Sequence, residues 1–386
     1  MRLPAGWPAS WWRSGPPPER RSRPCHTQGV SYVLAFLGFV ALIVLHEAGH
    51  YLAAKAVGMR VERFSLFFGP LLVKFRRGET EYGIGPIPLG GYVKITGMNP
   101  REEIPPEVVP RAYYNQPVWK RVVVILAGPA VNLLIAFVIV WALFLSNGQA
   151  TVIKQVFAVQ KGAPAASALK PGDTIVSVDG VGGSPRAIQQ AIRRDRCTGA
   201  LVNKCVAAVP LRVVVRRSDR QLTFELRPRY VAADKHMELG FEFDQGERAI
   251  GVAKAASLSV TGLWTVTKAT VSVVARIFEP QARKQLHGVV GGYTVAQESF
   301  AQSPSLALQV LALISLSLGI INLFPFLPLD GGHVFWALAE KVRGRRIPFE
   351  VMERASALGF VLIVIVFVIG LSNDISTLSG SGFNVR

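Results

Sequence analysis

The first apolar stretch of the chain, residues 31–57, reads SYVLAFLGFVALIVLHEAGHYLAAKAV. Crossing the hydrocarbon core of a bilayer takes about 20 predominantly apolar residues, so this stretch predicts a transmembrane helix. Near its end, His46, Glu47 and His50 form an H-E-x-x-H pattern. Desolvating two histidines and a glutamate in hydrocarbon is costly, which favours a functional site in the membrane over a chance cluster of polar residues.

The spacing of this pattern predicts zinc chemistry. At 3.6 residues per turn, His46 and His50 lie one turn apart on the same helix face, so both imidazoles can reach one tetrahedral zinc ion. Glu47 stands beside them and can take a proton from a water molecule at the zinc. Because a catalytic zinc usually takes a third protein ligand, we expect a further acid or histidine elsewhere in the membrane.

Asp330 is the candidate for the third ligand. It follows the third apolar stretch in the segment NLFPFLPLDGGH, residues 322–333, where two prolines stop regular helix. Backbone groups freed in this way must be satisfied inside protein or in a wet cavity. Two alternatives remain open. Asp330 could instead cap the helix that follows, and His333 could be a ligand, although we rank it second.

Composition agrees with a membrane protein. Of 386 residues, 50% are hydrophobic and only 18% are charged, which argues against a purely soluble enzyme. A segment at 256–278 carries Lys268 and Arg276 and is expected to be an amphipathic surface helix. The stretches expected to span the membrane are residues 31–57, 121–145, 306–332 and 355–372. The predicted fold is a polytopic α-helical membrane protein with four transmembrane helices.

The net charge of +18 indicates orientation rather than a nucleic-acid partner. Basic residues near membrane spans favour the cytoplasmic side, and residues 58–121 and 341–354 hold ten and five Lys and Arg residues. We therefore expect these loops in the cytoplasm and the segment between the second and third spans outside. The first and third spans then run parallel. His46, about 22 Å into its helix, and Asp330 both lie toward the cytoplasmic side.

Several segments are expected between and beside the spans. Residues 1–30 are rich in Pro, Arg and Ser and are expected to be a disordered basic tail. The cytoplasmic loop 58–120 is expected to contain a membrane-associated β-hairpin at 80–96, because turn formers alternate there with β-formers. The remaining segments are a folded extracytoplasmic domain at 150–230, a connector with the amphipathic helix at 231–305 and a tail at 373–386.

Taken together, the motifs resemble the intramembrane site-2 metalloproteases, and more narrowly the bacterial regulator-of-sigma-E-protease type. They are His46-Glu47-Ala48-Gly49-His50, residues 81–94, Ala127-Gly128-Pro129-Ala130-Val131-Asn132, one PDZ-like insert and residues 322–332. The resemblance implies that His46, His50 and Asp330 bind Zn²⁺, that Glu47 is the general base, and that Asn322 holds the substrate backbone or the developing oxyanion. The chain departs from the family pattern at Pro328 and at Leu286-His287-Gly288-Val289.

The resemblance implies hydrolysis of a peptide bond in a membrane-spanning substrate helix. The expected substrate is a single-span regulator such as an anti-sigma factor, trimmed beforehand by an upstream site-1-type protease, in the bacterial inner membrane. Clearance of remnant signal peptides is a second substrate class. A catalytically inactive membrane PDZ scaffold is an alternative that the intact site residues argue against. A transporter is another, but no inverted repeat is visible.

A protease must present an extended strand, because the carbonyls of a helix are bonded internally. The free edge of the 80–96 hairpin, with Gly90, Gly91, Tyr92 and Val93, is expected to pair with an unwound substrate by strand addition. The resemblance points to a membrane-dipping β-loop beside the zinc, and an ordinary cytoplasmic hairpin is the alternative. Asn132 is expected either to pack the second span against the first or to contact the substrate or the active site.

The insert resembles the PDZ domains of bacterial proteases. A small-residue segment, a Pro-Gly-Asp turn at 171–173 and strands at 211–216 and 222–227 carry this resemblance. Its groove is expected to exclude bulky substrates or to receive a freshly cut chain end, whereas a plain spacer is the alternative. Cys197 and Cys205 could form a disulfide on an oxidising outer face, which would leave Cys25 unpaired.

Overall fold

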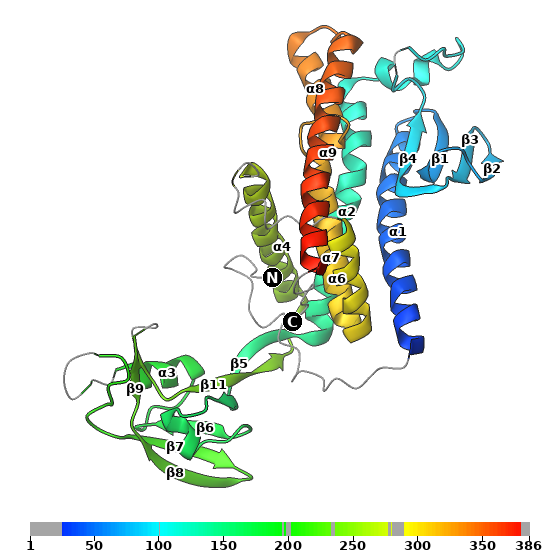
Figure 1. The fold of residues 1–386 in the computed structure, drawn as a ribbon. Helices are drawn as coiled ribbons and strands as arrows, with labels where there is room; N and C mark the ends of the chain where they lie inside the picture. Colours follow the sequence, from blue (N-terminus) through cyan, green and yellow to red (C-terminus); the bar gives the residue numbers. More distant parts are fainter. Residues whose placement is uncertain are drawn as a thin grey trace. The chain divides into compact units, whose positions relative to one another are not determined.

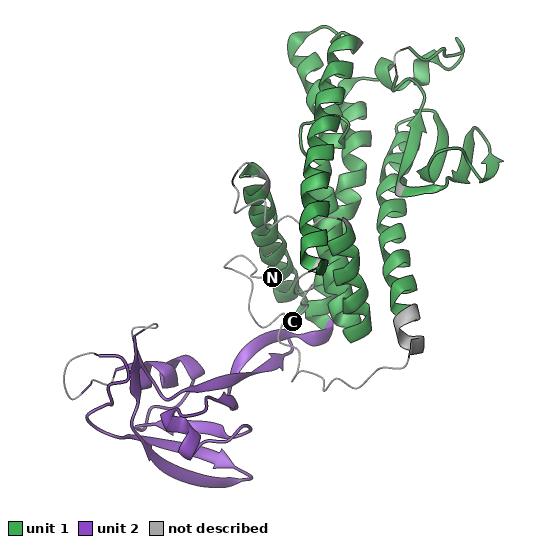
Figure 2. Cartoon of the chain, in the orientation of Figure 1, with its two compact units in different colours: residues 1–7, 15–145, 251–386 green, residues 8–14, 146–250 purple. Residues whose placement is uncertain are grey.

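The computed structural model describes residues 25–99, 101–194, 197, 202–232, 236–276, 279 and 289–379. Within these ranges two compact units are present, one of residues 25–145 and 251–379, and the other of residues 146–250 (Figure 2). The predicted tail at 1–30 lies largely outside the described residues, as do residues 380–386 and 286–288. Residues 25–30 are helical rather than disordered, since the first helix begins at Cys25, directly after the last proline of the tail.

Unit 1 contains the helices that can cross a membrane. They are α1 (Cys25–Ala56), α2 (Val118–Asn147), α7 (Pro304–Asn322) and α9 (Phe349–Ser379). Within the described part of the chain, only these four are long and apolar enough to span a bilayer. The segment expected at the surface forms α4 (Val252–Ala275), which is not among them. The expectation of four spans is therefore confirmed, and the protein is membrane-embedded. The third span was predicted to reach residue 332, but its helix ends at Asn322, ahead of Pro325 and Pro328.

Helices α1, α2, α4 and α6 of unit 1 contact α7. Ser303 caps α7 by accepting a hydrogen bond from Leu306 N at 3.1 Å, with Pro304 in the first turn. Buried side chains of α2, α4 and α7 form one apolar cluster. Helix α6 (Val289–Gln302) packs against α1, α7 and α9 (Figure 1). The short helix α8 (Asp330–Arg343) follows α7 after a seven-residue loop, 323–329.

Between α1 and α2 lies a four-stranded sheet in the order β2-β3-β1-β4. Its strands are β1 (Val61–Phe68), β2 (Val73–Arg77), β3 (Thr80–Ile84) and β4 (Ile87–Ile95). The predicted hairpin at 80–96 is wrong, because β3 and β4 pair with opposite sides of β1, in parallel and antiparallel senses respectively. Gly85 N donates to Leu66 O at 2.8 Å and Pro86 has no N–H, so the chain crosses the end of β1 instead of turning back.

The sheet is fixed to the end of α1 by apolar and ionic contacts. Buried residues of α1, β1, β4 and α2 share one cluster, which includes Ala54, Met59 and Val61. At its rim, Glu79 accepts hydrogen bonds from Arg111 and Lys55 at 2.7–2.8 Å. The Arg111 bonds, followed by those of Lys55, lower the pKa of Glu79 from 4.5 to about 2. These contacts hold β4 alongside the helix that carries the H-E-x-x-H pattern.

Unit 2 is an α+β domain. Its five-stranded antiparallel sheet has the order β11-β5-β6-β7-β8, and one helix, α3 (Pro185–Arg193), packs against it. The strands are β5 (Gln149–Val159), β6 (Thr174–Val178), β7 (Leu211–Arg217), β8 (Arg220–Leu226) and β11 (Phe241–Arg248), with a separate pair β9 (Arg229–Val231) and β10 (His236–Glu238). The strands expected at 211–216 and 222–227 are β7 and β8.

The predicted end of the inserted domain at residue 230 is wrong. Strand β11 pairs with β5 along nearly its whole length, so the domain extends to residue 250 and the connector begins later. The Pro-Gly-Asp turn leads into β6, and its Asp173 is buried and accepts hydrogen bonds from Arg217 and from Lys170 N. The bond from Arg217 is the main cause of the lowered pKa of Asp173.

Candidate metal centre

Three side chains from distant parts of unit 1 converge at one buried point. His46 and His50 lie on α1 and are 6% and 7% exposed. Both Nε2 atoms lie 3.3 Å from Oδ2 of Asp330, and 3.3 Å from each other. Within the described ranges this is the one group of three His, Cys, Asp or Glu residues spaced to hold a metal ion. His333, the second-ranked ligand, does not belong to it.

The donor atoms of this group fit a cation. His50 Nδ1 donates to Val124 O at 2.9 Å, so its Nε2 presents a lone pair to the centre. Asp330 Oδ2 is buried and receives no hydrogen bond of proper geometry. A desolvated carboxylate oxygen between two imidazole nitrogens is unfavourable unless a positive charge binds all three. Two nitrogens and one oxygen form a donor set that zinc accepts, with a fourth position left for the reactants.

Asp330 reaches the centre because of how α8 begins. The N-cap position of α8 is Leu329, without a side-chain cap, so Asp330 is the first helical residue and does not serve as the cap. The preceding loop folds tightly onto the two glycines that follow. A Cβ at Gly331 would collide with the Leu323 carbonyl, and one at Gly332 would lie 2.5 Å from Leu327 N. The Asp-Gly-Gly sequence therefore permits this close turn into the site.

Helix α2 supports α1 at close range. A Cβ at Gly49 would lie 2.6 Å from Ala127 O, and a Cβ at Gly128 would collide with Nε2 of His50. Two glycines thus allow the helix backbones to approach until α2 touches the histidines. The second span therefore packs closely against the first, and this contact also reaches the metal centre.

The asparagines and β4 residues expected at the site differ in their distance from it. Asn132 Nδ2 lies 3.0 Å from His46 Nδ1, and Asn322 Nδ2 lies 3.5 Å from His46 Nε2. On β4, Gly91 lies against the site, since a Cβ there would be 2.9 Å from Cγ of Glu47. Its neighbours on the strand are placed differently.

The other three β4 residues contact the sheet and its cluster instead. The Tyr92 hydroxyl accepts a hydrogen bond from Arg63, and its ring stacks on Phe68. Gly90 also packs against Phe68, and Val93 packs into the cluster between the sheet and α1. The Val124 carbonyl was not anticipated from the sequence, because a backbone acceptor leaves no trace in residue type.

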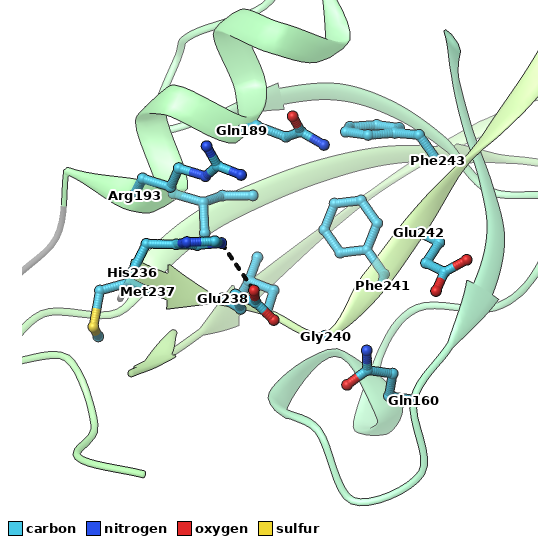
Figure 3. Close-up of a pocket in the computed structure, with 12 residues that line it drawn as sticks. Gln160, Gln189, Arg193, His236, Met237, Glu238, Gly240, Phe241, Glu242 and Phe243 are labelled. Atoms are coloured by element: carbon cyan, nitrogen blue, oxygen red, sulfur yellow. Dashed lines mark ion pairs between the residues drawn. The ribbon is translucent and has the colours of Figure 1, made fainter. Parts of the chain in front are cut away.

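Unit 2 carries a second candidate site. A cavity of about 320 Å³ lies between α3 and the segment from β10 to β11 (Figure 3). Phe241 and Phe243 point into it together with Gln189 and Arg193, and an ion pair between His236 and Glu238 at 2.8 Å also lines it. The sequence predicted a groove in this domain but not these lining residues, because eight of the twelve lie in the segment taken as connector. Nearby, Cys197 and Cys205 form a disulfide.

A family model described as peptidase family M50 matches residues 34–366. The chain belongs to peptidase family M50. Zinc metalloprotease Rip1 of Mycobacterium tuberculosis is 32% identical over 361 residues, covering 81% of this chain and 86% of Rip1. A provisionally named zinc metalloprotease of Brucella suis is 30% identical over 373 residues, covering 90% and 95% of the two chains. This M50 peptidase is therefore a zinc metalloendopeptidase, as the motifs implied.

The contact between Gly128 and His50 leads to a prediction. Gly128→Ala should weaken zinc affinity by at least roughly 10- to 100-fold, the scale of changes next to a metal ligand, because the methyl group displaces the His50 ring. Zinc content of the purified, detergent-solubilised chain measures this. Gly262→Ala on α4 is the matched control, since a Cβ there meets nothing within 4 Å. Wild-type zinc content in Gly128→Ala would contradict the steric argument.

Proposed function

We propose that this M50 peptidase cleaves peptide bonds within the membrane, with His46, His50 and Asp330 holding the zinc ion. The convergence of these three side chains on one buried point is the observation that carries the proposal. His46 and His50 belong to a helix long and apolar enough to cross the bilayer. A site built there can reach a bond in the transmembrane segment of another protein.

The residues around the zinc have separate parts in the reaction. When bound, zinc supplies Lewis-acid polarisation of the scissile carbonyl and of the attacking water. Glu47 takes the proton from that water and returns it to the leaving amide nitrogen, as a general base and then a general acid. The Asn322 amide, 3.5 Å from His46 Nε2, donates to the carbonyl oxygen as negative charge develops on it.

Strand β4 presents the substrate. It is an edge strand, because its only partner within the described sheet is β1. Its Gly91 lies against Glu47, so a strand added at this edge runs past the catalytic group. A substrate helix must unwind to pair there, which exposes its peptide carbonyls to the zinc. Gly91 is the β4 residue whose contact with Glu47 supports this role.

Both units contribute to the proposed substrate class. We propose a single-span regulator such as an anti-sigma factor, already shortened by a site-1-type protease, in a bacterial inner membrane. The basic loops favour a cytoplasmic zinc site and an extracytoplasmic unit 2. The groove of unit 2 has a mostly polar lining that includes Arg193 and two phenylalanines, Phe241 and Phe243, which could receive a terminal carboxylate and an apolar last side chain. Such an end is what a first cut leaves.

Removing the proposed base should stop the chemistry without removing the metal. Glu47→Gln keeps the size of the side chain but cannot accept the proton, so cleavage of a single-span reporter should fall by roughly 100- to 10,000-fold. Zinc content should stay at the wild-type level. Glu350→Gln, at an exposed residue in the first turn of α9, is the control for loss of a carboxylate. Equal cleavage by Glu47→Gln would refute the protease mechanism.

Cross-linking tests the edge strand. In a Glu47→Gln background, Ile87→Cys on β4 should form disulfides with cysteines placed in the reporter's transmembrane segment. Val73→Cys on β2, the opposite edge of the same sheet, should not, although Val73 is 65% exposed and Ile87 only 45%. The measurement is the yield of each cross-linked species on a gel. A higher yield from Val73→Cys would exclude β4 as the substrate strand.

The groove of unit 2 should recognise a chain end. A fluorescent peptide with an apolar C-terminal residue should bind the full chain at least about tenfold tighter than its amidated twin, a difference of about 1.4 kcal/mol. Arg193→Glu should abolish this preference by reversing the charge beside the groove. Arg186→Glu, on the same helix but outside the groove lining, should retain it. Fluorescence anisotropy gives the affinities, and equal binding of both peptides would exclude chain-end recognition.

A further inference from the structure

The two nitrogens of His46 face different neighbours. Nε2 lies 3.3 Å from Asp330 Oδ2, at the centre of the three-residue group. To bind a metal ion it must present a lone pair, and the one proton of the neutral ring then belongs on Nδ1. Nδ1 points instead at Asn132 of α2, with Nδ2 of that residue 3.0 Å away. A protonated Nδ1 needs an acceptor, which an amide nitrogen is not.

His50 shows how α2 solves the same problem one helical turn later on α1. Its Nδ1 lies 2.9 Å from the Val124 carbonyl, and a carbonyl can only accept. The proton of His50 is therefore held on Nδ1, and Nε2 is left free for the metal. Both histidines thus have their outward nitrogen against α2, but only His50 meets a group whose role is unambiguous.

The amide of Asn132 can be turned to provide the missing acceptor. Its oxygen and nitrogen have nearly the same shape, so a half-turn about the last bond exchanges them without moving other atoms. As placed, the side chain is 0% exposed, its nitrogen faces His46, and its Oδ1 is buried with no hydrogen-bond partner. The exchanged orientation puts the oxygen 3.0 Å from Nδ1, at ordinary hydrogen-bond distance.

We propose that Asn132 is a positioning residue whose amide oxygen accepts the Nδ1 proton of His46 and thereby keeps Nε2 available to zinc. The inference rests on the proposed metal site and goes beyond it by assigning a role to a residue outside the ligand set. Asn322 cannot take this part, because its amide approaches Nε2 instead.

The backbone around Asn132 is held firmly enough for this role. Ser315 Oγ of α7 donates to the Asn132 carbonyl at 2.9 Å, and both residues are fully buried. A Cβ at Gly319 would lie 3.3 Å from Asn132 Cβ, so α7 presses against this position of α2. Helix α7 therefore fixes the amide, and the amide fixes the ring of His46.

Substitutions that separate accepting from donating test the inference. Asn132→Leu removes the acceptor at similar volume and should weaken Co²⁺ and Zn²⁺ binding by roughly 10- to 100-fold. Asn132→Asp offers only acceptor oxygens and should keep affinity within a few-fold of wild type. Affinities come from chelator competition on the detergent-solubilised full chain, and the Co²⁺ absorption spectrum reports the coordination. Gln309→Leu on α7 is the control, because the Gln309 amide also has a buried oxygen without a partner. It should change neither the metal affinity nor the Co²⁺ spectrum.

Each outcome either supports or overturns the proposed role of Asn132. Wild-type metal affinity in Asn132→Leu would overturn the inference. So would an equal loss of affinity in Asn132→Asp and Asn132→Leu, because the Asn132 amide would then act as a donor or only through packing. If Asn132→Leu does not fold, Asn132→Asp still decides at a pH where its carboxyl group is ionised, since an ionised carboxylate can only accept. A wild-type chain that binds neither metal would instead refute the proposed metal site itself.

Discussion

The donor atoms of His46, His50 and Asp330 lie together in the apolar interior of unit 1, and a bound cation makes this arrangement energetically favourable. Two imidazole nitrogens and a carboxylate oxygen lie 3.3 Å apart, and the carboxylate receives no proper hydrogen bond. Without a positive charge the desolvation of Asp330 would oppose the fold. The arrangement of unit 1 depends on this point, because α1 and α8 are separated by most of the chain and must both reach it.

Close packing of α2 against α1 fixes the orientation of the histidine rings at the metal centre. Gly49 and Gly128 remove the side chains that would hold α1 and α2 apart, and the gap closes until α2 contacts the histidine rings. Such contacts orient the rings, and ring orientation decides which nitrogen faces the metal. A site in water could rely on solvent to satisfy the outward nitrogens. In a membrane interior the protein must supply those partners itself.

The sheet and unit 2 each carry a surface that the proposed function assigns to substrate recognition. With β3 and β4 on opposite sides of β1, one edge of β4 stays free, next to Glu47. Unit 2 adds a groove of its own, formed where α3 faces the start of β11. The recognition proposed for both surfaces relies on the substrate backbone, so it would depend little on substrate sequence.

The sequence alone determined the membrane class, the four spans and the H-E-x-x-H ligands, because these depend on local composition and on spacing within one helix. It also singled out Asp330, since a carboxylate after two prolines at the end of an apolar stretch has few other uses. Local sequence patterns predicted the pairing of β3 and β4 and the end of unit 2 wrongly, and they did not predict which residues line the groove. All three features depend on contacts between distant segments. The contacts of α2 with His46 and His50 were likewise decided only by tertiary structure. Which nitrogen of a ring meets which carbonyl or amide is set by the distance and rotation between two helices, and no residue type encodes that.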